Sequence, residues 1–176
     1  MTYYLYKVSE PREDWTFEPR PFWRAHDWSF SDDQPREGLV EDRVLYAAEF
    51  DEINIHLFPR VWRSRVWLED EERCARLDRL GFSWAEGSRA VIFAGEADRN
   101  AIEAFSPTIF TFDRSGFERT PTNEFVSREP RNAVSVEMIS FREAQERWRF
   151  EVVYVSDVES LVGTLREKGI DHQIQT

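Results

Sequence analysis

The hydrophobic and polar positions predict short strands separated by short helices. Tyr3 to Val8 is rich in aromatic and β-branched residues, which favour a strand. Alternating or continuously apolar runs predict further strands over Val61 to Leu68, Ala90 to Ala94, Thr108 to Asp113 and Phe150 to Val155. Helical spacing predicts helices over Glu69 to Leu80, Glu96 to Phe105, Phe141 to Arg147 and Val158 to Lys168.

The order of these elements indicates the fold class. Arg43 to Phe50 adds a strand that runs into a short helix, which Pro59 ends. Because strands and helices do not alternate regularly, a doubly wound fold is disfavoured. We expect an α+β domain with an antiparallel or mixed sheet and short flanking helices.

Residues 9–41 form the longest stretch without clear periodicity. Prolines recur through it, so we expect an irregular excursion rather than a regular element. Long loops within compact domains are frequently functional. Its aromatic residues are expected to anchor it, and they are Trp15, Phe17, Phe22, Trp23, Trp28 and Phe30.

Composition favours one domain over residues 1–176. The chain has 41% hydrophobic and 15% aromatic residues, enough to bury one substantial core. No apolar run is long enough to cross a bilayer, and Met1 to Val8 lacks the character of a signal peptide. We therefore expect a cytoplasmic protein without a membrane partner. Cys74 is the single cysteine, which excludes a disulfide framework and a thiolate zinc site.

The charge balance argues against nucleic acid as a general partner. The net charge is −11, so the surrounding field repels a phosphate backbone. Arginines are numerous, whereas lysine occurs only at Lys7 and Lys168. Arginine suits bidentate recognition of phosphate or carboxylate, so a local anion site is compatible with the acidic whole.

Several familiar chemistries lack their residues. With seven glycines the chain has no glycine-rich phosphate loop. His26, His56 and His172 are too scattered for a ligand pair at helical spacing. The acidic clusters at Asp32–Asp33 and Glu69–Glu72 fit solvated charge and a helix start better than a metal cage, and we expect no metal.

Candidate chemistry concentrates in Thr122 to Ile139. Alternation around a predicted strand places Glu124, Val126 and Arg128 on one face and Phe125, Ser127 and Glu129 on the other. Such a strand can hold one glutamate over a pocket. An edge strand whose charges discourage pairing, ended by Pro130, explains the pattern equally well.

Five short motifs carry a family resemblance. They are L-Y-K-V-S-E (Leu5 to Glu10), F-E-P-R-P (Phe17 to Pro21), V-L-Y-A-A (Val44 to Ala48), F-P-R (Phe58 to Arg60) and V-S-R-E-P (Val126 to Pro130). In this order they resemble an uncharacterised family of small bacterial proteins, over most of the first 140 residues. That family more distantly resembles the ADP-ribosyltransferase superfamily.

The resemblance implies an ADP-ribosyltransferase-like fold and NAD as the substrate. Lys7 falls where the superfamily has the histidine or arginine that holds the NAD ribose, and Tyr46 falls near the residue that packs on nicotinamide. Glu124 falls near the glutamate that hydrogen-bonds the ribose, whereas Glu129 is the carboxylate shared with the uncharacterised family. The implied nucleotide-binding residues are Lys7, Ser9, Arg20, Tyr46, Ser127 and Arg128.

The implied reaction is cleavage of the nicotinamide glycosidic bond by an ADP-ribosyltransferase or NAD glycohydrolase. Glu124 or Glu129 stabilises the oxocarbenium-like state, and arginines hold the pyrophosphate. Lys7 departs from the pattern, because a protonated lysine cannot accept a hydrogen bond as a neutral histidine does. A relative that binds the nucleotide without turnover is therefore also consistent with the sequence.

An acidic interaction protein is the alternative from another class. An immunity or inhibitor protein with a tryptophan-rich acidic surface covers a basic toxin or enzyme without catalysis. In that case the excursion from Trp15 to Phe30 is the binding surface. Convergence of Lys7, Tyr46 and a glutamate on one concave pocket favours the nucleotide hypothesis, and dispersal favours the interaction protein.

Overall fold

The computed structural model describes residues 4–24, 31–32, 40–121 and 124–175. Internal contacts divide the chain into two compact units. Unit 1 comprises Met1–Asn54 and Thr108–Met138, and unit 2 comprises Ile55–Pro107 and Ile139–Thr176. The described residues form mainly antiparallel sheets and four α-helices, which confirms the predicted α+β class.

Unit 1 is built from strands. The largest sheet runs in the order β12-β8-β1-β5-β10-β9, with β3 and β4 joined to β5, and β2 pairs separately with β11. The strands are β1 (Tyr4–Ser9), β2 (Thr16–Phe17), β3 (Arg20–Arg24), β4 (Ser31–Asp32), β5 (Val40–Glu49), β8 (Thr108–Asp113), β9 (Glu118–Arg119), β10 (Phe125–Ser127), β11 (Arg131–Asn132) and β12 (Ser135–Met138).

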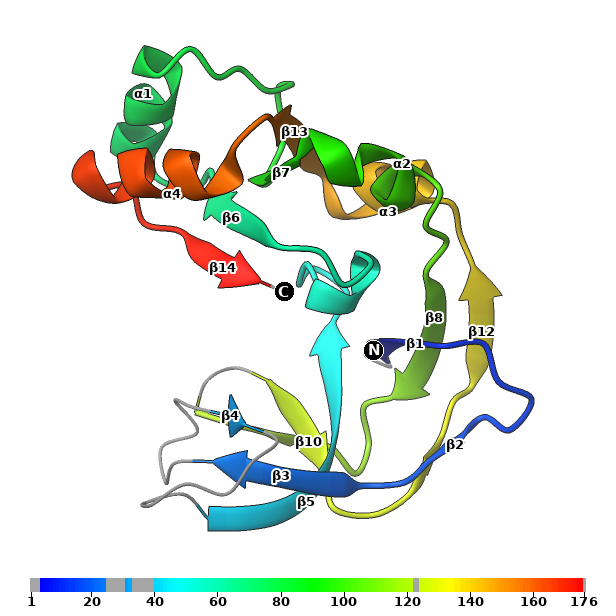
Figure 1. The fold of residues 1–176 in the computed structure, drawn as a ribbon. Coiled ribbons are helices and arrows are strands. Elements are labelled where there is room, and N and C mark those ends of the chain that lie inside the picture. The colour runs from blue at the N-terminus through cyan, green and yellow to red at the C-terminus, as the bar shows by residue number, and fades with distance from the viewer. Residues whose placement is uncertain (1–3, 25–30, 33–39, 122–123, 176) are drawn as a thin grey trace. The chain divides into compact units, whose positions relative to one another are not determined.

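Strand β5 changes partner along its length. It pairs with β3 from Val40 to Val44, with β10 from Leu45 to Ala47, and with β1 at Ala48 and Glu49. In Figure 1 the strand bends between the part beside β3 and its end. One strand therefore links the β3 segment to the sheet that contains β1 and β8.

Aromatic side chains fill the core of unit 1. Phe17 on β2 packs edge-on against Phe110 and Phe112 of β8, with ring centroids 4.9 Å and 5.4 Å away. Leu45 belongs to the same buried cluster. Because Phe17 lies on β2, this packing fixes the start of the 9–41 segment against the sheet.

Unit 2 combines a four-stranded sheet with helices. The sheet order is β13-β7-β6-β14, in which β13 and β7 are parallel and the other pairs antiparallel. Its elements are η1 (Ile55–Leu57), β6 (Arg63–Trp67), α1 (Glu71–Arg79), β7 (Ala90–Gly95), η2 (Glu96–Asp98), α2 (Arg99–Glu103), α3 (Phe141–Trp148), β13 (Phe150–Val155), α4 (Val158–Glu167) and β14 (Gln173–Gln175).

Local sequence determines where the unit 2 helices begin. The Asp70 side chain accepts a hydrogen bond from the Arg73 backbone N–H, and Asp157 caps α4 in the same way. Ser140 and Glu143 form a reciprocal capping box at α3. Leu77 of α1 and Leu165 of α4 then pack on Val66, Val91 and Phe93 of the sheet in one buried cluster.

Most predicted elements of regular periodicity are present, and one expectation was wrong. The excursion is not irregular throughout, because β3 pairs with β5 over five residues and β2 pairs with β11. The strand predicted from Arg43 is part of β5, and the short helix expected before Pro59 is the 3-10 helix η1. Strands β12 and β14 were not predicted.

The physical reason for these errors is non-local pairing. Pro19 and Pro21 interrupt the sequence pattern that would predict a strand at β3. The strand forms nevertheless, because its backbone pairs with β5. Trp28 and Phe30 lie outside the described residues. No helix in the described part of the chain is long and apolar enough to cross a membrane.

Arg63 is a buried cation that holds a loop of unit 2. Only 2% of the residue is exposed. Its guanidinium donates to the carbonyl oxygens of Ile55 at 2.6 Å, Pro59 at 3.1 Å and Val61 at 2.9 Å, and to Gln175 Oε1 at 3.3 Å. Burial, and next the charge of Arg65, lower the pKa of Arg63 to about 10.

We predict that Arg63→Met destabilises the protein by about 3 kcal/mol, because three carbonyl groups lose the donor that the buried Arg63 guanidinium supplies. Chemical denaturation followed by tryptophan fluorescence measures the effect. Arg79→Met, at an exposed position of α1, is the control and is expected to change stability by less than about 0.5 kcal/mol. Equal small effects in both variants would contradict a clamping role for Arg63.

Candidate functional site

Lys7 and Ser9 lie on β1, which is held between neighbouring strands. Lys7 is opposite Phe110, and Ser9 is opposite Thr108, in the antiparallel ladder with β8. Lys7 is half-buried and follows Tyr6, the last β1 residue that pairs with β5. The backbone at Lys7 is therefore fixed where β1 stops pairing with β5.

Arg20 brings a second positive charge close to Lys7. It is the first residue of β3 and lies opposite Val44 of β5. Burial first, and next the charge of Arg20, lower the pKa of Lys7 to about 8. Among the ion pairs of the described residues, none includes Lys7 or Arg20. We call these two residues, whose charges act on each other, the cation pair, and neither has a described carboxylate partner.

Tyr46 lies on the other face of the sheet from Lys7. Alternation along β5 separates Tyr46 from Leu45 and Ala47, and Ala47 clusters with Leu5 of β1. Lys7 shares the face of Leu5 by the same alternation. The Tyr46 ring instead packs edge-on against Phe22 of β3, with centroids 4.8 Å apart.

Ser127 is buried inside a hydrogen-bonded turn. Its hydroxyl donates to the Glu129 carbonyl at 2.9 Å and accepts from the Glu129 backbone N–H at 3.2 Å. Arg131 Nε also donates to the Ser127 hydroxyl at 2.8 Å, while Arg131 Nη2 donates to the Gly116 carbonyl at 2.9 Å. The V-S-R-E-P motif is thereby tied to the turn before β9.

The charged residues around this turn have local partners. Arg128 pairs with Glu118 at 2.8 Å and with Asp42 at 3.2 Å, and the hydrogen bond that it donates to Glu118, followed by the one to Asp42, raises the pKa of Arg128. Glu129 is exposed and pairs with Arg131 at 3.5 Å. These contacts join β5, β9 and the end of β10.

Glu124 lies at the opposite end of β10 from Glu129. It is exposed and precedes the strand. Its backbone N–H donates to the Thr120 hydroxyl at 3.1 Å, and its carbonyl accepts from the Thr120 N–H at 2.8 Å. The two candidate carboxylates are thus separated by the length of β10.

The structure brings together only part of the predicted set. The charge of Arg20 acts on Lys7, and Ser9 lies on the same face of β1 as Lys7. Ser127, Arg128 and Glu129 form a separate turn whose partners, Arg131 and Gly116, the sequence analysis did not single out. The Ser115-Gly116 turn signal and the arginine just after V-S-R-E-P were the available clues.

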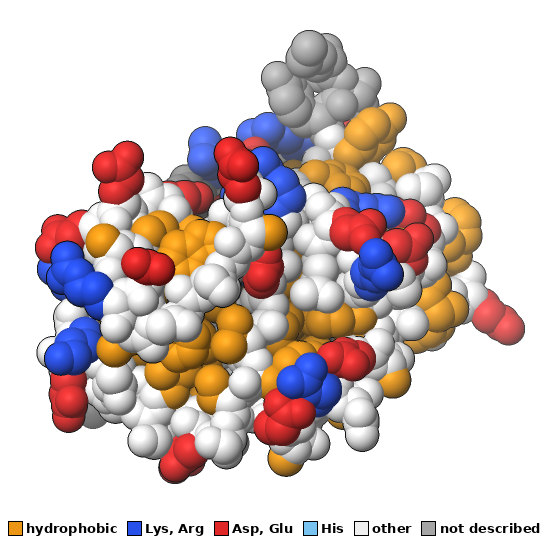
Figure 2. All heavy atoms as spheres, turned by 90° about the horizontal axis from the view of Figure 1, so that it is seen from above, with side chains coloured by type: hydrophobic (Ala, Val, Ile, Leu, Met, Phe, Trp, Pro, Cys, Tyr) orange, Lys and Arg blue, Asp and Glu red, His pale blue; other side chains and the backbone are white. Residues whose placement is uncertain are grey.

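Several other charged side chains have partners of opposite sign. On the face seen in Figure 2, Lys and Arg side chains lie beside Asp and Glu side chains. Helix pairs of this kind include Arg99 with Glu96 at 2.6 Å and Arg142 with Glu146 at 3.1 Å. Against this background, Lys7 and Arg20 are a local excess of positive charge in an acidic chain.

The described residues contain no group of three or more His, Cys, Asp or Glu side chains arranged to hold a metal. Comparisons with protein-family models, curated proteins and solved structures found no match to this chain.

We predict that Gly116→Ala destabilises the protein by about 2 kcal/mol. Gly116 has φ +80°, and an added Cβ would lie 2.1 Å from Arg131 Nη2, so both the backbone and the Arg131 contacts are disturbed. Denaturation midpoints of Gly116→Ala, Arg131→Ala and the double variant measure the coupling.

The double variant separates the two causes. If Arg131 is the obstacle, Gly116→Ala costs about 1 kcal/mol less in the Arg131→Ala background than alone. Gly87→Ala, at φ +84° with no atom within 4 Å of the added Cβ, reports the backbone strain by itself. Strict additivity in the double variant would contradict the proposed contact.

We predict that Lys7 makes stability rise between pH 8 and pH 10.5. The pKa of Lys7 is about 8 in the folded protein, against 10.5 for an ordinary lysine, so the unfolded chain binds more protons in this window. Below pH 8, Lys7 is charged in both the folded and the unfolded protein. Its charge then lowers the free energy of unfolding by the full amount, at most about 3 kcal/mol. Lys7→Met should therefore exceed the wild type in stability at pH 7, with the difference shrinking toward pH 10.5.

Urea denaturation at several pH values measures this difference. Lys168→Met is the matched control, because Lys168 is the only other lysine and is exposed. Parallel stability curves for the wild type and Lys7→Met across this range would contradict the prediction.

Proposed function

We propose that unit 1 binds a nucleotide of the NAD and ADP-ribose class, with Lys7 and Arg20 holding its pyrophosphate. The observation that carries this proposal is the cation pair itself. Two neighbouring positive charges repel each other, and partial burial increases the cost of charging Lys7. A bound dianionic pyrophosphate reverses both effects, because each cation then has an opposite charge within reach.

The negative net charge of the chain favours a small nucleotide over nucleic acid as the ligand of this cation pair. A net charge of −11 disfavours a long polyanion such as nucleic acid, whose phosphates extend beyond the local site. A small nucleotide places its few charges only where the cations lie. Arg20 supplies planar paired donors, and Ser9 on the same face of β1 supplies a hydroxyl.

The family resemblance supports the same class of ligand. We propose that unit 1 is an ADP-ribosyltransferase-like fold in which Lys7 stands where the superfamily has its ribose-binding residue but contacts the pyrophosphate instead. The Tyr46 and Phe22 rings provide an aromatic surface on the other face of the sheet. This separation of Tyr46 from Lys7 favours binding of the pyrophosphate over a complete nicotinamide site.

Binding is better supported than turnover. Cleavage of the glycosidic bond needs a carboxylate beside the developing oxocarbenium ion. Glu129 is paired with Arg131, and the Glu124 backbone is hydrogen-bonded to Thr120. We therefore propose a nucleotide-binding protein, with Glu124 and Glu129 as the residues whose replacement tests for any hydrolysis.

Calorimetric titration with NAD and with ADP-ribose tests the proposal. We predict saturable binding at pH 7 that weakens roughly tenfold or more in Arg20→Gln, a loss of at least about 1.4 kcal/mol. Binding should also weaken above pH 8, because Lys7 loses its proton there. Arg142→Gln is the control, since it removes one exposed arginine charge from α3 in unit 2.

Product analysis accompanies the titration. Nicotinamide release by the wild type that disappears in Glu124→Gln or Glu129→Gln would extend the function to catalysis and identify the carboxylate. Binding without release fits the proposed function. Absence of binding to both nucleotides would overturn it.

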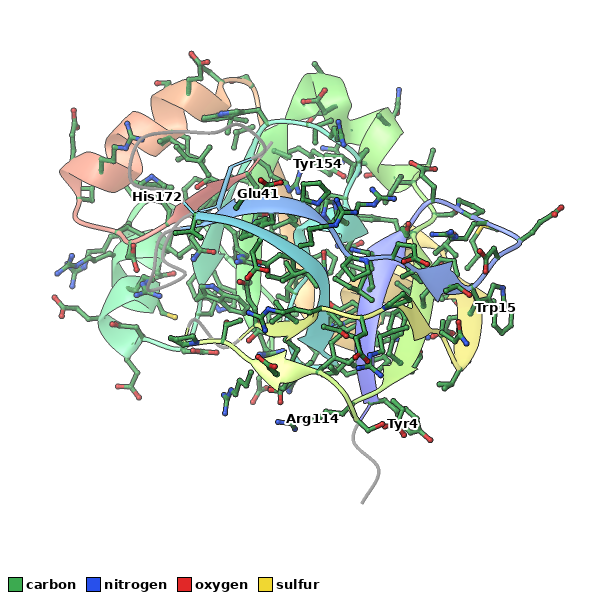
Figure 3. All side chains as sticks on the ribbon, turned by 90° about the horizontal axis from the view of Figure 1, so that it is seen from below. Tyr4, Trp15, Glu41, Arg114, Tyr154 and His172 are labelled. Atoms are coloured by element: carbon green, nitrogen blue, oxygen red, sulfur yellow. The ribbon has the colours of Figure 1, made fainter. Side chains whose placement is uncertain are left out.

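A second candidate function is an acidic interaction protein. Trp15 is 41% exposed, and its carbonyl accepts from the Ala133 N–H just before the exposed Val134 and edge strand β12. Met138 at the end of β12 is 64% exposed. Figure 3 shows the Trp15 side chain pointing away from the ribbon. These side chains form an apolar rim on a chain whose net charge suits a basic protein partner.

Substitutions in this rim separate the two functions. A triple variant, Trp15→Ser, Val134→Ser and Met138→Ser, should leave nucleotide binding unchanged if Lys7 and Arg20 are the site. The interaction function instead requires that a basic protein binds the wild type and not this variant, in a direct binding assay with the purified partner.

A further inference from the structure

We propose that β12 is a docking edge that accepts an extended, basic segment of a partner protein as an added strand. The inference rests on the second candidate function, the acidic interaction protein, and names how the partner binds and what its segment contains. It draws on the backbone geometry of β12, on the exposed apolar rim of Trp15, Val134 and Met138, and on the charges beside them in the chain.

Strand β12 is the last strand of the largest sheet. The sheet order ends with β12 beside β8, and no second strand pairs with β12 in the described ranges of the chain. Figure 1 shows β12 alongside β8. An edge strand presents backbone N–H and C=O groups that an extended segment of another protein can pair with.

Two hydrogen bonds show which residues of the β8 segment face β12. The Val134 N–H donates to the Thr111 carbonyl at 2.7 Å, and the Ile139 N–H donates to the Pro107 carbonyl at 3.1 Å. Both acceptors have odd residue numbers, and backbone groups alternate in direction along a strand. The odd-numbered residues of β8 therefore direct their backbone groups toward β12.

The register then identifies the outward backbone groups of β12. Ser135 lies opposite Thr111 and Glu137 lies opposite Ile109, so the backbone groups of Ser135 and Glu137 point toward β8. By alternation, the N–H and C=O groups of the other two residues of β12 point away from β8. The second of these is Met138, whose residue is 64% exposed. The outward edge is thus open to solvent at this end of β12.

The two faces of β12 define the side-chain pattern of the added strand. Val136 packs against the buried cluster that contains Phe110, and Met138 lies on the same face by alternation. Ser135 and Glu137 lie on the opposite face and are exposed. Because residues directly opposite each other in a sheet share a face, the partner segment alternates apolar residues beside Met138 with polar residues beside Glu137.

Three exposed carboxylates flank the apolar rim in the chain. Glu13 and Asp14 precede Trp15, and Glu137 precedes Met138. Arg12 pairs with Asp14 at 4.0 Å and offsets one of these charges. The remaining negative charge favours a basic partner segment. It disfavours a second copy of this chain, because each copy carries a net charge of −11.

Synthetic peptides test the inference on the full chain. The probe is a labelled peptide of alternating Lys and Val with blocked ends, and its acidic counterpart has Glu in place of Lys. We predict saturable binding of the Lys-Val peptide, measured by fluorescence anisotropy, with an affinity roughly tenfold or more above that of the Glu-Val peptide. Equal binding of the two peptides, or binding of neither, would overturn the proposal.

Backbone methylation distinguishes strand addition from charge attraction alone. N-methylation of every Val, or of every Lys, keeps the charge of the peptide and removes the N–H groups from one edge of its extended form. Only one edge pairs with β12. One methylated peptide should therefore lose affinity roughly tenfold or more, and the other should keep it. Equal affinities of the two methylated peptides would contradict strand addition.

Met138→Pro tests the edge from the side of the protein. Because the Met138 N–H points away from β8, proline removes an outward donor and leaves the ladder with β8 intact. Affinity for the Lys-Val peptide should fall roughly fivefold relative to Met138→Thr, the matched control, which keeps the N–H. The same affinity in both variants would count against the proposal, and the methylated peptides test it in the wild type if Met138→Pro fails to fold.

Glu137→Lys tests the charge complementarity. It should weaken binding of the Lys-Val peptide more than Glu86→Lys does, because Glu86 is exposed in unit 2 and lies outside β12. Equal weakening in the two variants would show that net charge alone attracts the peptide, and would overturn docking at β12.

The inference and the functions fail separately. Equal binding of both methylated peptides overturns strand addition and leaves the acidic interaction protein in place. A preference for one methylation pattern supports the inference whether or not the chain binds NAD, because it does not involve Lys7 or Arg20. Sedimentation of the wild type tests the other occupant. Self-association that Met138→Pro abolishes would assign the edge to a second copy and overturn the basic partner.

Discussion

The pairing of β5 with three strands is the constraint on which the arrangement of unit 1 depends. Strands β3, β10 and β1 each pair with a different part of β5. Their positions relative to one another are therefore fixed by β5. Arg20 begins β3 and Lys7 lies just beyond the β1 pairing, so both cations are placed by this one strand. The same alternation along β5 separates Tyr46 from the face that carries Leu5 and Lys7.

Arg63 and Lys7 are two buried or half-buried cations whose charges have different surroundings. Arg63 is fully buried, and backbone carbonyls with one glutamine accept its hydrogen bonds, so its charge is satisfied by the loop it holds. Lys7 is half-buried next to Arg20, and its pKa is lowered instead. A buried cation with a full set of acceptors stabilises a structure, whereas a cation whose charge is disfavoured is chemically available. The contrast distinguishes a structural residue from a candidate functional one.

The sequence predicted the locally determined elements well. The helix that starts after Ser140 has its capping residues within four positions, and the helix after Asp157 has a single capping side chain. By contrast, β3 exists because of its pairing with β5, which no local pattern around Pro21 indicates. The candidate site depends still more on distant contacts. The closeness of Lys7 to Arg20, and the use of Arg131 to hold Ser127 and Gly116, both follow from strand register rather than from the motifs themselves.

The interleaving of the two units along the chain sets an order for their folding during synthesis. Unit 1 takes its last strand, β12, from residues that end at Met138, so all its segments are made before the second segment of unit 2 begins. Unit 2 by then has β6 and β7 but not β13, the parallel partner of β7, nor β14, whose Gln175 accepts from Arg63. During synthesis, therefore, the first segment of unit 2 has an edge of β7 without its partner strand. That edge is open to non-native pairing until β13 is made. Unit 1 meets the same problem earlier in synthesis, because Met1–Asn54 lacks β8 until residues 55–107 have been made.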